Sequence, residues 1–445
     1  MDPSHASGET IAPLQGTSAD SATAAVPYKE LVLAFSMGVY VLEQYLNIRQ
    51  HRKLHAVHPP AALSGTVSEE DFCNAQAYGR DKSYFQFVLD AWSQLQTVLT
   101  LTLDLLPLLW HTVGALMLQY AGLDAEYERT HSVLFVIALS VISSILSIPF
   151  SLYRTFVIEE RHGFNKQTIG LFFVDFVKMQ VLSAVITAPL IAGVLTIIHW
   201  AGESFYYYVW AFMVCFQLVM VTIYPTVIQP LFNKVEPLAP GSLREKIEAL
   251  AARIHFPLTK LYVIDGSRRS SHSNAYFYGF FKNKRIVLFD TLMEHSSEEE
   301  VCAILGHELG HWKLNHTLKG LGVAQVHMFG LFYLFSHCYR DSTLYQSFGF
   351  VDGTMPVLIG FLLFSYIFSP VESVLSFLMN IMSRKHEFEA DAYAKKLGYA
   401  ESLRSGLIKL HTKNLGHMNP DSWYSTYHFS HPPLVERLEA LGKTE

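Results

Sequence analysis

The chain has 445 residues, of which 50% are hydrophobic and only 16% are charged, against roughly 25% charged residues in a typical soluble domain. The net charge of -6 and the lack of a dense run of Lys and Arg exclude a nucleic-acid-binding surface, which needs a basic stripe for the phosphates. The composition therefore predicts an integral membrane protein.

Apolar stretches long enough to cross a bilayer as helices follow one another along the chain. About seven are found, near residues 30–48, 84–121, 132–156, 169–200, 204–229, 317–340 and 354–382. The polar segment 1–27 lacks the basic start and short apolar core of a cleaved signal, and we expect it to be a disordered luminal tail. The predicted fold class is an all-α integral membrane protein, with spans one to five within 28–231 and spans six and seven within 317–383.

Lys and Arg are unevenly distributed among the connections between these spans. The connections after the first and third spans are rich in them, whereas the opposite connections are poor in them. The positive-inside rule places the rich side in the cytosol. By parity the insert 232–316 and the carboxyl-terminal part 384–445 are both cytosolic, so we expect their residues to meet in one catalytic domain.

The insert 232–316 carries a mixed pattern of secondary structure. Residues Gly241 to Ile254 predict an amphipathic helix, and Lys260 to Ile264 and Arg285 to Asp290 predict strands. The aromatic-rich stretch Asn274 to Phe281 is suited to extend the sheet as an edge strand. A small α+β module inserted between membrane helices is the expected arrangement.

A helix start within this insert precedes a metal-binding motif. Ser297 and Glu300 are spaced as a capping box, and the helix is expected to run on through His307, Glu308 and His311 into the sixth span. Histidines four residues apart share one helix face and can bind one ion. Zinc with three protein ligands keeps a position for water, whose proton an adjacent carboxylate such as Glu308 can accept. Coincidence on an amphipathic helix is the competing explanation.

The third ligand must come from elsewhere in the chain. The four cysteines show no C-x-x-C spacing, so histidine or carboxylate is required. His316 is expected to lie off the metal-facing side of the helix. Glu387 is the better candidate, with Asp391 one turn later and able to accept a hydrogen bond from the outer N–H of a ligand histidine. From spacing alone, a solvated helix charge at Glu387 is an equally good explanation.

Two residues near the carboxyl end are candidate stabilisers of an oxyanion. His431 precedes a pair of prolines and Arg437 follows them. A His or Arg donor beside the metal would stabilise the negative charge that develops during peptide hydrolysis. A turn residue is the competing explanation for His431.

Ionisable residues also fall inside the predicted spans, where a charge facing lipid would cost several kcal/mol. They are Glu43, Asp90, Asp104, His111, Asp175, Lys178 and Glu372. We expect them to face an interior that holds water. Pairing between helices in a dry bundle is the alternative.

Several ordered runs of residues are more specific than the metal motif alone. They are Phe156 to Asn165, Tyr224 to Phe232, Ser273 to Gly279, the metal motif itself, Ser383-Arg384 leading to Glu387 and Asp391, and Ser430 to Pro432 with Arg437. On these runs the chain, from about Leu31 to Leu441, resembles the eukaryotic type I CAAX prenyl endopeptidases, which are zinc proteases of the membrane.

The resemblance implies a role for each candidate residue. It implies that His307, His311 and Glu387 bind one zinc ion and that Glu308 activates the attacking water. It further implies that Asp391 supports the ligands, that His431 and Arg437 lie at the active site, and that an edge strand with Asn274 and Ala275 aligns the substrate backbone. An edge strand offers unpaired backbone groups to an extended peptide.

The resemblance also implies a fold and a biological setting. Seven helices would enclose a large intramembrane chamber beneath the cytosolic zinc domain. The substrates would be prenylated CAAX proteins that lose their last three residues, and membrane lipids would surround the enzyme. The location would be the endoplasmic reticulum membrane, with the inner nuclear membrane as a second possibility.

Two other functions fit parts of the pattern. One is quality-control proteolysis of membrane proteins by a related metalloprotease, although those enzymes are shorter and lack the run Glu159 to Asn165. The other is a transporter or scaffold with a structural metal. A structural zinc normally has four protein ligands, whereas three and a poised carboxylate are found here, which favours catalysis.

Overall fold

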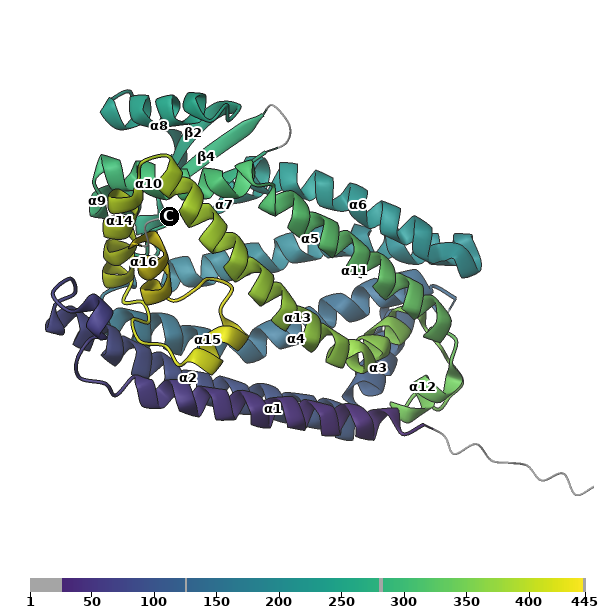
Figure 1. The fold of residues 1–445 in the computed structure, drawn as a ribbon. Coiled ribbons are helices and arrows are strands. Elements are labelled where there is room, and N and C mark those ends of the chain that lie inside the picture. Colours follow the sequence, from purple (N-terminus) through teal and green to yellow (C-terminus); the bar gives the residue numbers. More distant parts are fainter. Residues whose placement is uncertain (1–25, 125, 280–282, 443–445) are drawn as a thin grey trace, which may run out of the picture.

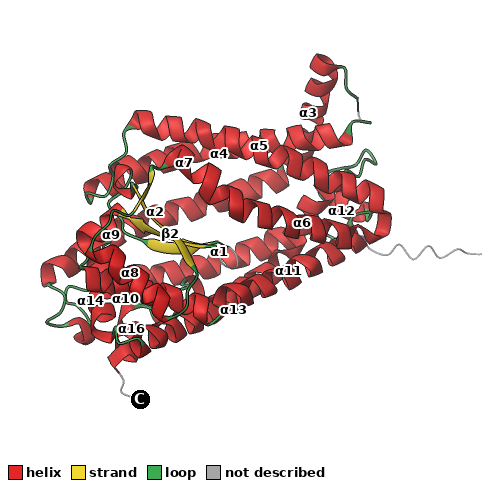
Figure 2. Ribbon diagram, turned by 90° about the horizontal axis from the view of Figure 1, so that it is seen from above, coloured by secondary structure: helices red, strands yellow, loops and turns green. Residues whose placement is uncertain are grey.

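The computed structural model describes residues 26–124, 126–279 and 283–442. Almost all of the predicted luminal tail 1–27 lies outside these residues. Two layers are visible in Figure 1, a bundle of long helices and a smaller cap of short helices and strands at one end. Figure 2 shows the strands gathered at the cap end of the bundle.

The bundle is built from long apolar helices that contact one another side by side. They are α1 (Tyr28–Lys53), α2 (Glu69–Thr102), α3 (Leu105–Ala121), α4 (Glu128–Tyr153), α5 (Ile169–Ala201), α6 (Phe205–Ile223), α11 (His316–Cys338) and α13 (Val357–Lys396). Many of their large apolar side chains face outward, as expected for helices in contact with lipid.

The number of membrane spans depends on how two features are counted. Among the described residues, five helical stretches are long and apolar enough to cross a membrane, or six if α2 and α3 form one bent span. One of the five, Ile169–Phe232, contains both α5 and α6. These two helices reverse direction at Gly202, whose φ is 59°, and pack against each other. The protein is thus a multi-pass membrane protein, while the count of seven and the enclosed chamber stay predictions.

The span predicted near 84–121 is a bent pair of helices, α2 and α3. Helix α2 begins earlier, at Glu69 after the N-cap Ser68, and the chain bends by 68° between α2 and α3. Asp104 lies at the bend in the left-handed region, with φ of 49°, a conformation that Asp tolerates better than most residues. Its carboxylate is 2.5 Å from the Lys29 ammonium of α1, so an ion pair distant in sequence accompanies the bend.

The uninterrupted helix predicted from Ser297 into the sixth span is wrong. Helix α10 (Glu298–Lys313) ends before α11 begins at His316, and Asn315 between them has a φ of 57°. Asn is one of the residues that ends helices in this conformation. The break turns His316 back toward the metal motif, which a continuous helix could not do.

The cap contains a four-stranded sheet and the short helices around it. The strands are β1 (Val235–Pro237), β2 (Leu258–Ile264), β3 (Ala275–Tyr278) and β4 (Lys284–Phe289), and the short helices are α7 (Gln229–Phe232), α8 (Ser242–Arg253), α9 (Asp290–His295), α12 (Ser342–Ser347), α14 (Ala400–Lys413), α15 (Ser422–His428) and α16 (Leu434–Gly442). Of these, α7 leads out of the bundle, whereas α12 and α15 do not surround the sheet: α12 lies at the far end of the bundle, and α15 packs against α1 and α13.

The strand order is β1-β2-β4-β3, with β2 and β4 parallel and the other pairs antiparallel. Strand β3 lies at the edge, where the stretch 274–281 was expected, although residues 280 and 281 lie outside the described residues. Strand β1 has only three residues and ends in proline, so no alternating pattern predicts it.

One hydrophobic core joins the cap. Ile247 of α8, Leu288 of β4 and Leu309 of α10 are fully buried in it, and Leu438 of α16 is 4% exposed. Helix α13 links the two layers, because its start packs in the bundle and its end packs on α10. Glu387 is therefore carried into the cap by the continuation of a membrane helix. The predicted boundaries at residues 232, 317 and 384 stay predictions.

Candidate metal centre

Helix α10 holds the metal motif in a fixed orientation. Its start is a capping box, in which the Ser297 hydroxyl accepts from the Glu300 N–H and the Glu300 carboxylate accepts from the Ser297 N–H. Leu305 and Leu309 are 1% and 0% exposed in the cap core. Because these leucines fix the rotation of the helix, His307 and His311 face helix α13.

A glycine inside the motif allows α13 to come close. A Cβ atom at Gly310 would lie 3.3 Å from the backbone of Ala390 and 3.2 Å from the ring of Tyr393. That spacing is tighter than ordinary van der Waals contact. The absence of a side chain at Gly310 thus brings α10 and α13 together at the level where Glu387 faces the two histidines.

Three side chains converge from these two helices. The Nε2 atoms of His307 and His311 are 3.2 Å apart, and the Glu387 oxygens lie 3.2 Å from His311 Nε2 and 3.5 Å from His307 Nε2. Tetrahedral zinc with bonds of about 2.0–2.1 Å separates its ligand atoms by about 3.3 Å. The Oε1 atom of Glu387 faces His311 and its Oε2 atom faces His307, so the three side chains are close enough together to hold one metal ion.

The Glu387 carboxylate has an oxygen that its neighbours do not satisfy. Oε2 is buried and has no hydrogen-bond partner among the described residues, although His431 Nδ1 is 2.9 Å away and Arg437 Nη1 is 3.4 Å away. A buried carboxylate oxygen without a partner is costly. A bound cation would remove that cost, so the residues present fit a metal ion.

Asp391 and Arg437 fix the outer side of His307. The Asp391 carboxylate accepts from His307 Nδ1 at 2.8 Å and from the Arg437 guanidinium at 2.7 and 2.8 Å. When His307 Nδ1–H donates a hydrogen bond to Asp391, the neutral ring presents its Nε2 lone pair toward Glu387 and His311. Arg437 is 7% exposed and engages Asp391 through two parallel bonds. It therefore orients the ligands.

Glu308 lies beside the ligand atoms and lines a small cavity. The cavity has a volume of about 130 Å³, and its walls include His307, Glu387 and His431 together with Asn274 of the chain entering β3. Burial raises the pKa of Glu308 above its ordinary range, against the opposing effect of the neighbouring histidines. A carboxylate with a raised pKa is a stronger base near neutral pH.

The edge strand borders the same cavity. Asn274 and Ala275 line it, and β3 is paired only with β4 in the described sheet. The Asn274 carbonyl accepts from the Phe289 N–H, and its side-chain oxygen accepts from the Ala275 N–H. The outer edge of β3 can therefore receive an extended peptide by strand addition.

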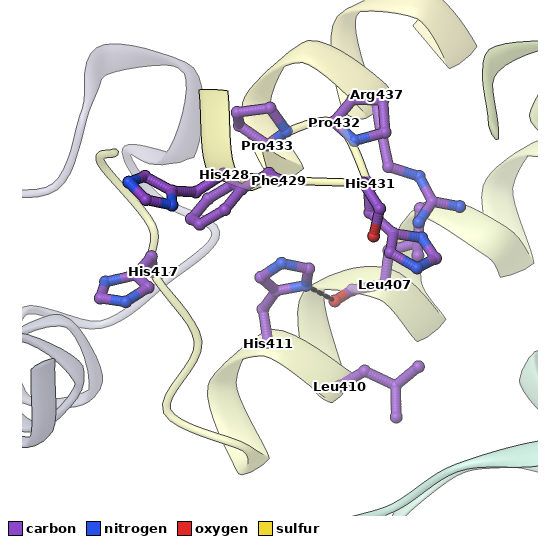
Figure 3. A pocket seen from close by; sticks show the side chains of 11 residues that line it. Leu407, Leu410, His411, His417, His428, Phe429, His431, Pro432, Pro433 and Arg437 are labelled. Atoms are coloured by element: carbon purple, nitrogen blue, oxygen red, sulfur yellow. Dashed lines mark hydrogen bonds between the residues drawn. The ribbon is translucent and has the colours of Figure 1, made fainter. Parts of the chain in front are cut away.

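A second and larger cavity adjoins the first (Figure 3). Its volume is about 440 Å³, and it shares Leu407, Leu410, His431 and Arg437 with the small cavity. Its wall also carries His411, whose Nδ1 donates to the Leu407 carbonyl. Burial lowers the pKa of His411 to about 4, so the ring is neutral near pH 7. The cavity thus combines apolar walls with several imidazoles and, on the side shared with the small cavity, the Arg437 guanidinium.

The structure brings together all of the site residues proposed from the sequence. His307, His311 and Glu387 form the ligand set, and Glu308, Asp391, His431, Arg437, Asn274 and Ala275 surround it. Sequence reasoning missed two contributors. His411 has no motif that would indicate it, whereas Gly310 could have been recognised as a small residue on the helix face between His307 and His311.

Comparisons with known proteins cover nearly the whole chain. Residues 49–234 match the family model for the CAAX prenyl protease N-terminal part with five membrane helices, and residues 237–445 match peptidase family M48. A CAAX prenyl protease 1 homolog from Oryza sativa subsp. japonica is 51% identical, over 94% of this chain and 98% of that protein. The Homo sapiens CAAX prenyl protease 1 homolog is 45% identical, over 92% of this chain and 94% of that protein. The crystal structure of S. mikatae Ste24p superposes with a TM-score of 0.88 at 42% identity, covering 94% of this chain and 99% of that one.

Proposed function

The protein belongs to the CAAX prenyl proteases of peptidase family M48, and from this premise we propose that it removes the last three residues of prenylated CAAX proteins. The observation that carries this proposal is the set His307, His311 and Glu387, spaced for one metal ion, with Glu308 beside it. Membership in a metalloprotease family implies a metal. We propose that the metal is a single zinc ion, because two imidazoles and one carboxylate are a common catalytic zinc set.

The proposed chemistry divides the work between the metal and the chain. A zinc ion held by His307, His311 and Glu387 would polarise the scissile carbonyl and lower the pKa of a water molecule to about 7. Glu308 accepts the proton of the attacking water and passes it to the departing amine. His431 donates to the oxyanion that forms on the carbonyl. Arg437 and Asp391 keep His307 in the tautomer that leaves Nε2 free.

The substrate backbone is proposed to lie along β3. An extended peptide can pair with the free edge at Asn274 and Ala275, which places one of its carbonyls in the small cavity beside Glu308. Residues on the carboxyl side of the cut then reach the larger cavity, whose apolar walls at Leu407, Leu410 and Phe429 suit the aliphatic residues of a CAAX end (Figure 3).

The membrane setting follows from the same fold. The protein is a multi-pass membrane protein, and we propose that its catalytic cap faces the cytosol, because the cap-side connections carry the excess of Lys and Arg. We further propose the endoplasmic reticulum membrane and the contiguous inner nuclear membrane as its location. The prenyl group of a substrate would be stabilised by apolar surroundings at about 0.8 kcal/mol for each buried methylene.

The direct test uses the purified full-length protein in detergent and a farnesylated CAAX peptide. We expect mass spectrometry to show loss of the last three residues, inhibition by a chelator and recovery on adding zinc. The same peptide without its farnesyl group is the matched control, and it should compete poorly. Cleavage that survives complete metal removal would refute the metal-dependent mechanism, and equal cleavage of both peptides would favour general quality-control proteolysis.

A further inference from the structure

The outer nitrogen of His311 leads to a second group of polar side chains. His311 Nδ1 is 3.0 Å from His316 Nδ1, and His316 Nε2 is 2.9 Å from the Glu389 carboxylate. His316 is 4% exposed, and the His386 ring stacks on it with centroids 4.0 Å apart and planes within 8°. The turn at Asn315 brings His316 into this position.

His316, His386 and Glu389 are close enough together to suggest a second metal site, but the stacking of the rings argues against one. The lone pair of an imidazole nitrogen lies in the plane of its ring. Because the planes of His316 and His386 are nearly parallel and displaced by the stacking distance, one ion cannot lie in both planes. In addition, both nitrogens of His316 already have partners at hydrogen-bond distance.

The positions of the protons on His311 and His316 follow from which nitrogen of His311 faces the other two metal ligands. Its Nε2 points to His307 and Glu387, so in the metal-bound form the proton of this ring is on Nδ1. Nδ1–H then donates to His316 Nδ1, which leaves the His316 proton on Nε2 to donate to Glu389. Each nitrogen atom of His311 and His316 thus has a single role, as metal ligand, hydrogen-bond donor or hydrogen-bond acceptor.

We propose that His316 and Glu389 form a hydrogen-bond relay that orients the metal ligand His311 and increases its basicity. The relay is the counterpart of Asp391, which does the same for His307 by direct contact. The two supports differ in environment: the Asp391 side chain is 1% exposed, whereas the Glu389 side chain is 37% exposed. His316 and Glu389 are positioning residues, since neither touches the substrate cavity or a second ligand atom.

Zinc affinity tests the relay without using activity. The full-length protein in detergent is freed of metal and titrated with zinc in competition with a fluorescent chelator of known affinity. We expect His316→Leu to weaken zinc binding about 10–100-fold, as is typical when a partner of a ligand histidine is lost. His316→Gln keeps an acceptor for His311 and a donor for Glu389, so it should stay within about threefold of the wild type. Glu389→Gln keeps an acceptor but removes the charge, so its zinc affinity should lie between those of His316→Leu and His316→Gln.

His386→Phe is the matched control. Phenylalanine keeps the stacked ring but removes both nitrogens, so the relay predicts wild-type affinity and one zinc per chain. A second zinc in the wild type that His386→Phe removes would overturn the relay in favour of a metal site. Equal losses for Leu and Gln at position 316 would also overturn it, because packing rather than hydrogen bonding would then be at work. If His316→Leu does not fold, the zinc affinities of His316→Gln and Glu389→Gln test the relay instead.

The inference rests on the proposed metal site, and the two can fail separately. If the wild type takes up no zinc at one per chain, the assignment of His307, His311 and Glu387 fails. If the wild type binds one zinc and His316→Leu binds it equally well, only the relay fails. Cobalt substitution adds a second measurement: the visible d–d bands should shift in His316→Leu and stay unchanged in His386→Phe.

Discussion

The membrane bundle and the catalytic cap handle ionisable side chains in different ways. In the bundle, Asp175 of α5 accepts two hydrogen bonds from Arg269, at 2.8 and 3.1 Å, and Asp90 of α2 accepts from Gln44 and Asn47 of α1. In the cap, the buried Oε2 of Glu387 has no such partner among the described residues. These two bundle carboxylates accept hydrogen bonds from the chain itself, whereas Oε2 of Glu387 has only ion-pair contacts, with His431 at 2.9 Å and Arg437 at 3.4 Å, and can bind a cation.

The difference separates structural charges from functional ones. The sequence predicts water around the ionisable residues of the spans, but Asp104 pairs with Lys29, Lys178 donates to the Leu231 carbonyl and Glu372 is 2.9 Å from His327. For these residues the structure favours the alternative of pairing between elements. Burial and charge alone therefore did not distinguish the two regions, whereas the convergence of Glu387 with His307 and His311 does.

Removal of the base should have the largest effect and should sharpen this contrast. Glu308→Gln keeps the shape of the side chain but cannot accept a proton, so we expect kcat for a farnesylated CAAX peptide to fall about 10³-fold. Zinc should stay at one per chain, because Glu308 is not a ligand. Mass spectrometry of the product and metal analysis measure the two quantities. Glu299→Gln, an exposed change in the first turn of the same helix, is the control, and turnover retained in the Glu308 variant would remove this residue from its role.

Breaking the charge network behind the ligands should have the next largest effect. Arg437→Leu leaves Asp391 and Glu387 buried without their cation, at a cost of about 3–5 kcal/mol. Arg437→Lys keeps the charge but loses the two-pronged contact, so its cost should be smaller. Thermal unfolding in detergent, followed for the zinc-loaded protein, checks the order. Equal stability of the Leu and Lys variants would show that the geometry, rather than the charge, of Arg437 is what matters.

The parts of the site that lie within one helix could be predicted, because residues four positions apart share a helix face. The spacing of His307 and His311 places them on one helix face, and the spacing of Glu387 and Asp391 does the same on α13. Pairing Glu387 with the histidines needed the family resemblance, because no rule of spacing joins residues 76 and 80 positions apart. The α+β nature of the cap and its edge strand followed from apolar periodicity and aromatic content.

The turns and long-range pairs could not be predicted in the same way. The breaks at Asp104 and Asn315 depend on single residues in left-handed conformations, which a hydropathy pattern does not detect. The contact of His316 with His311 is a consequence of the second break. Pairs such as Asp175 with Arg269 join elements that the sequence alone does not place side by side.

Removal of a bundle charge should be milder than removal of the Arg437 charge at the metal centre. Asp175→Asn removes the negative charge that pairs with Arg269, whose side chain is only 22% exposed. We expect a loss of about 1–3 kcal/mol in stability with kcat unchanged. Glu236→Gln breaks the exposed pair with Lys234 and should change stability by no more than about 0.5 kcal/mol. Unfolding and turnover measured on both variants test the distinction. A large fall in kcat for Asp175→Asn would mean that the bundle charge acts on the site.

The smallest effect predicted for a buried charge concerns a cap carboxylate, Glu300, that the chain does compensate. Glu300 accepts from the Ser297 N–H and from Lys409 through Oε2, and from the Ser405 hydroxyl through Oε1. Burial raises the pKa of Glu300, but these hydrogen bonds outweigh it and hold the pKa below the ordinary range. A lowered folded pKa means that the stabilisation is present at neutral pH and is lost as the pH falls through and below about 4.3, the ordinary value for Glu.

Glu300→Gln keeps an acceptor for the helix cap but loses the charge, so the wild type should be more stable by about 1 kcal/mol at pH 7. The difference should shrink as the pH is lowered from about 5, because protonation removes the same charge from the wild type. Unfolding of both proteins in detergent at a series of pH values measures it. If the difference stayed constant with pH, the cap and not the charge would be responsible, and Glu300 would no longer serve as the compensated counterpart of Glu387.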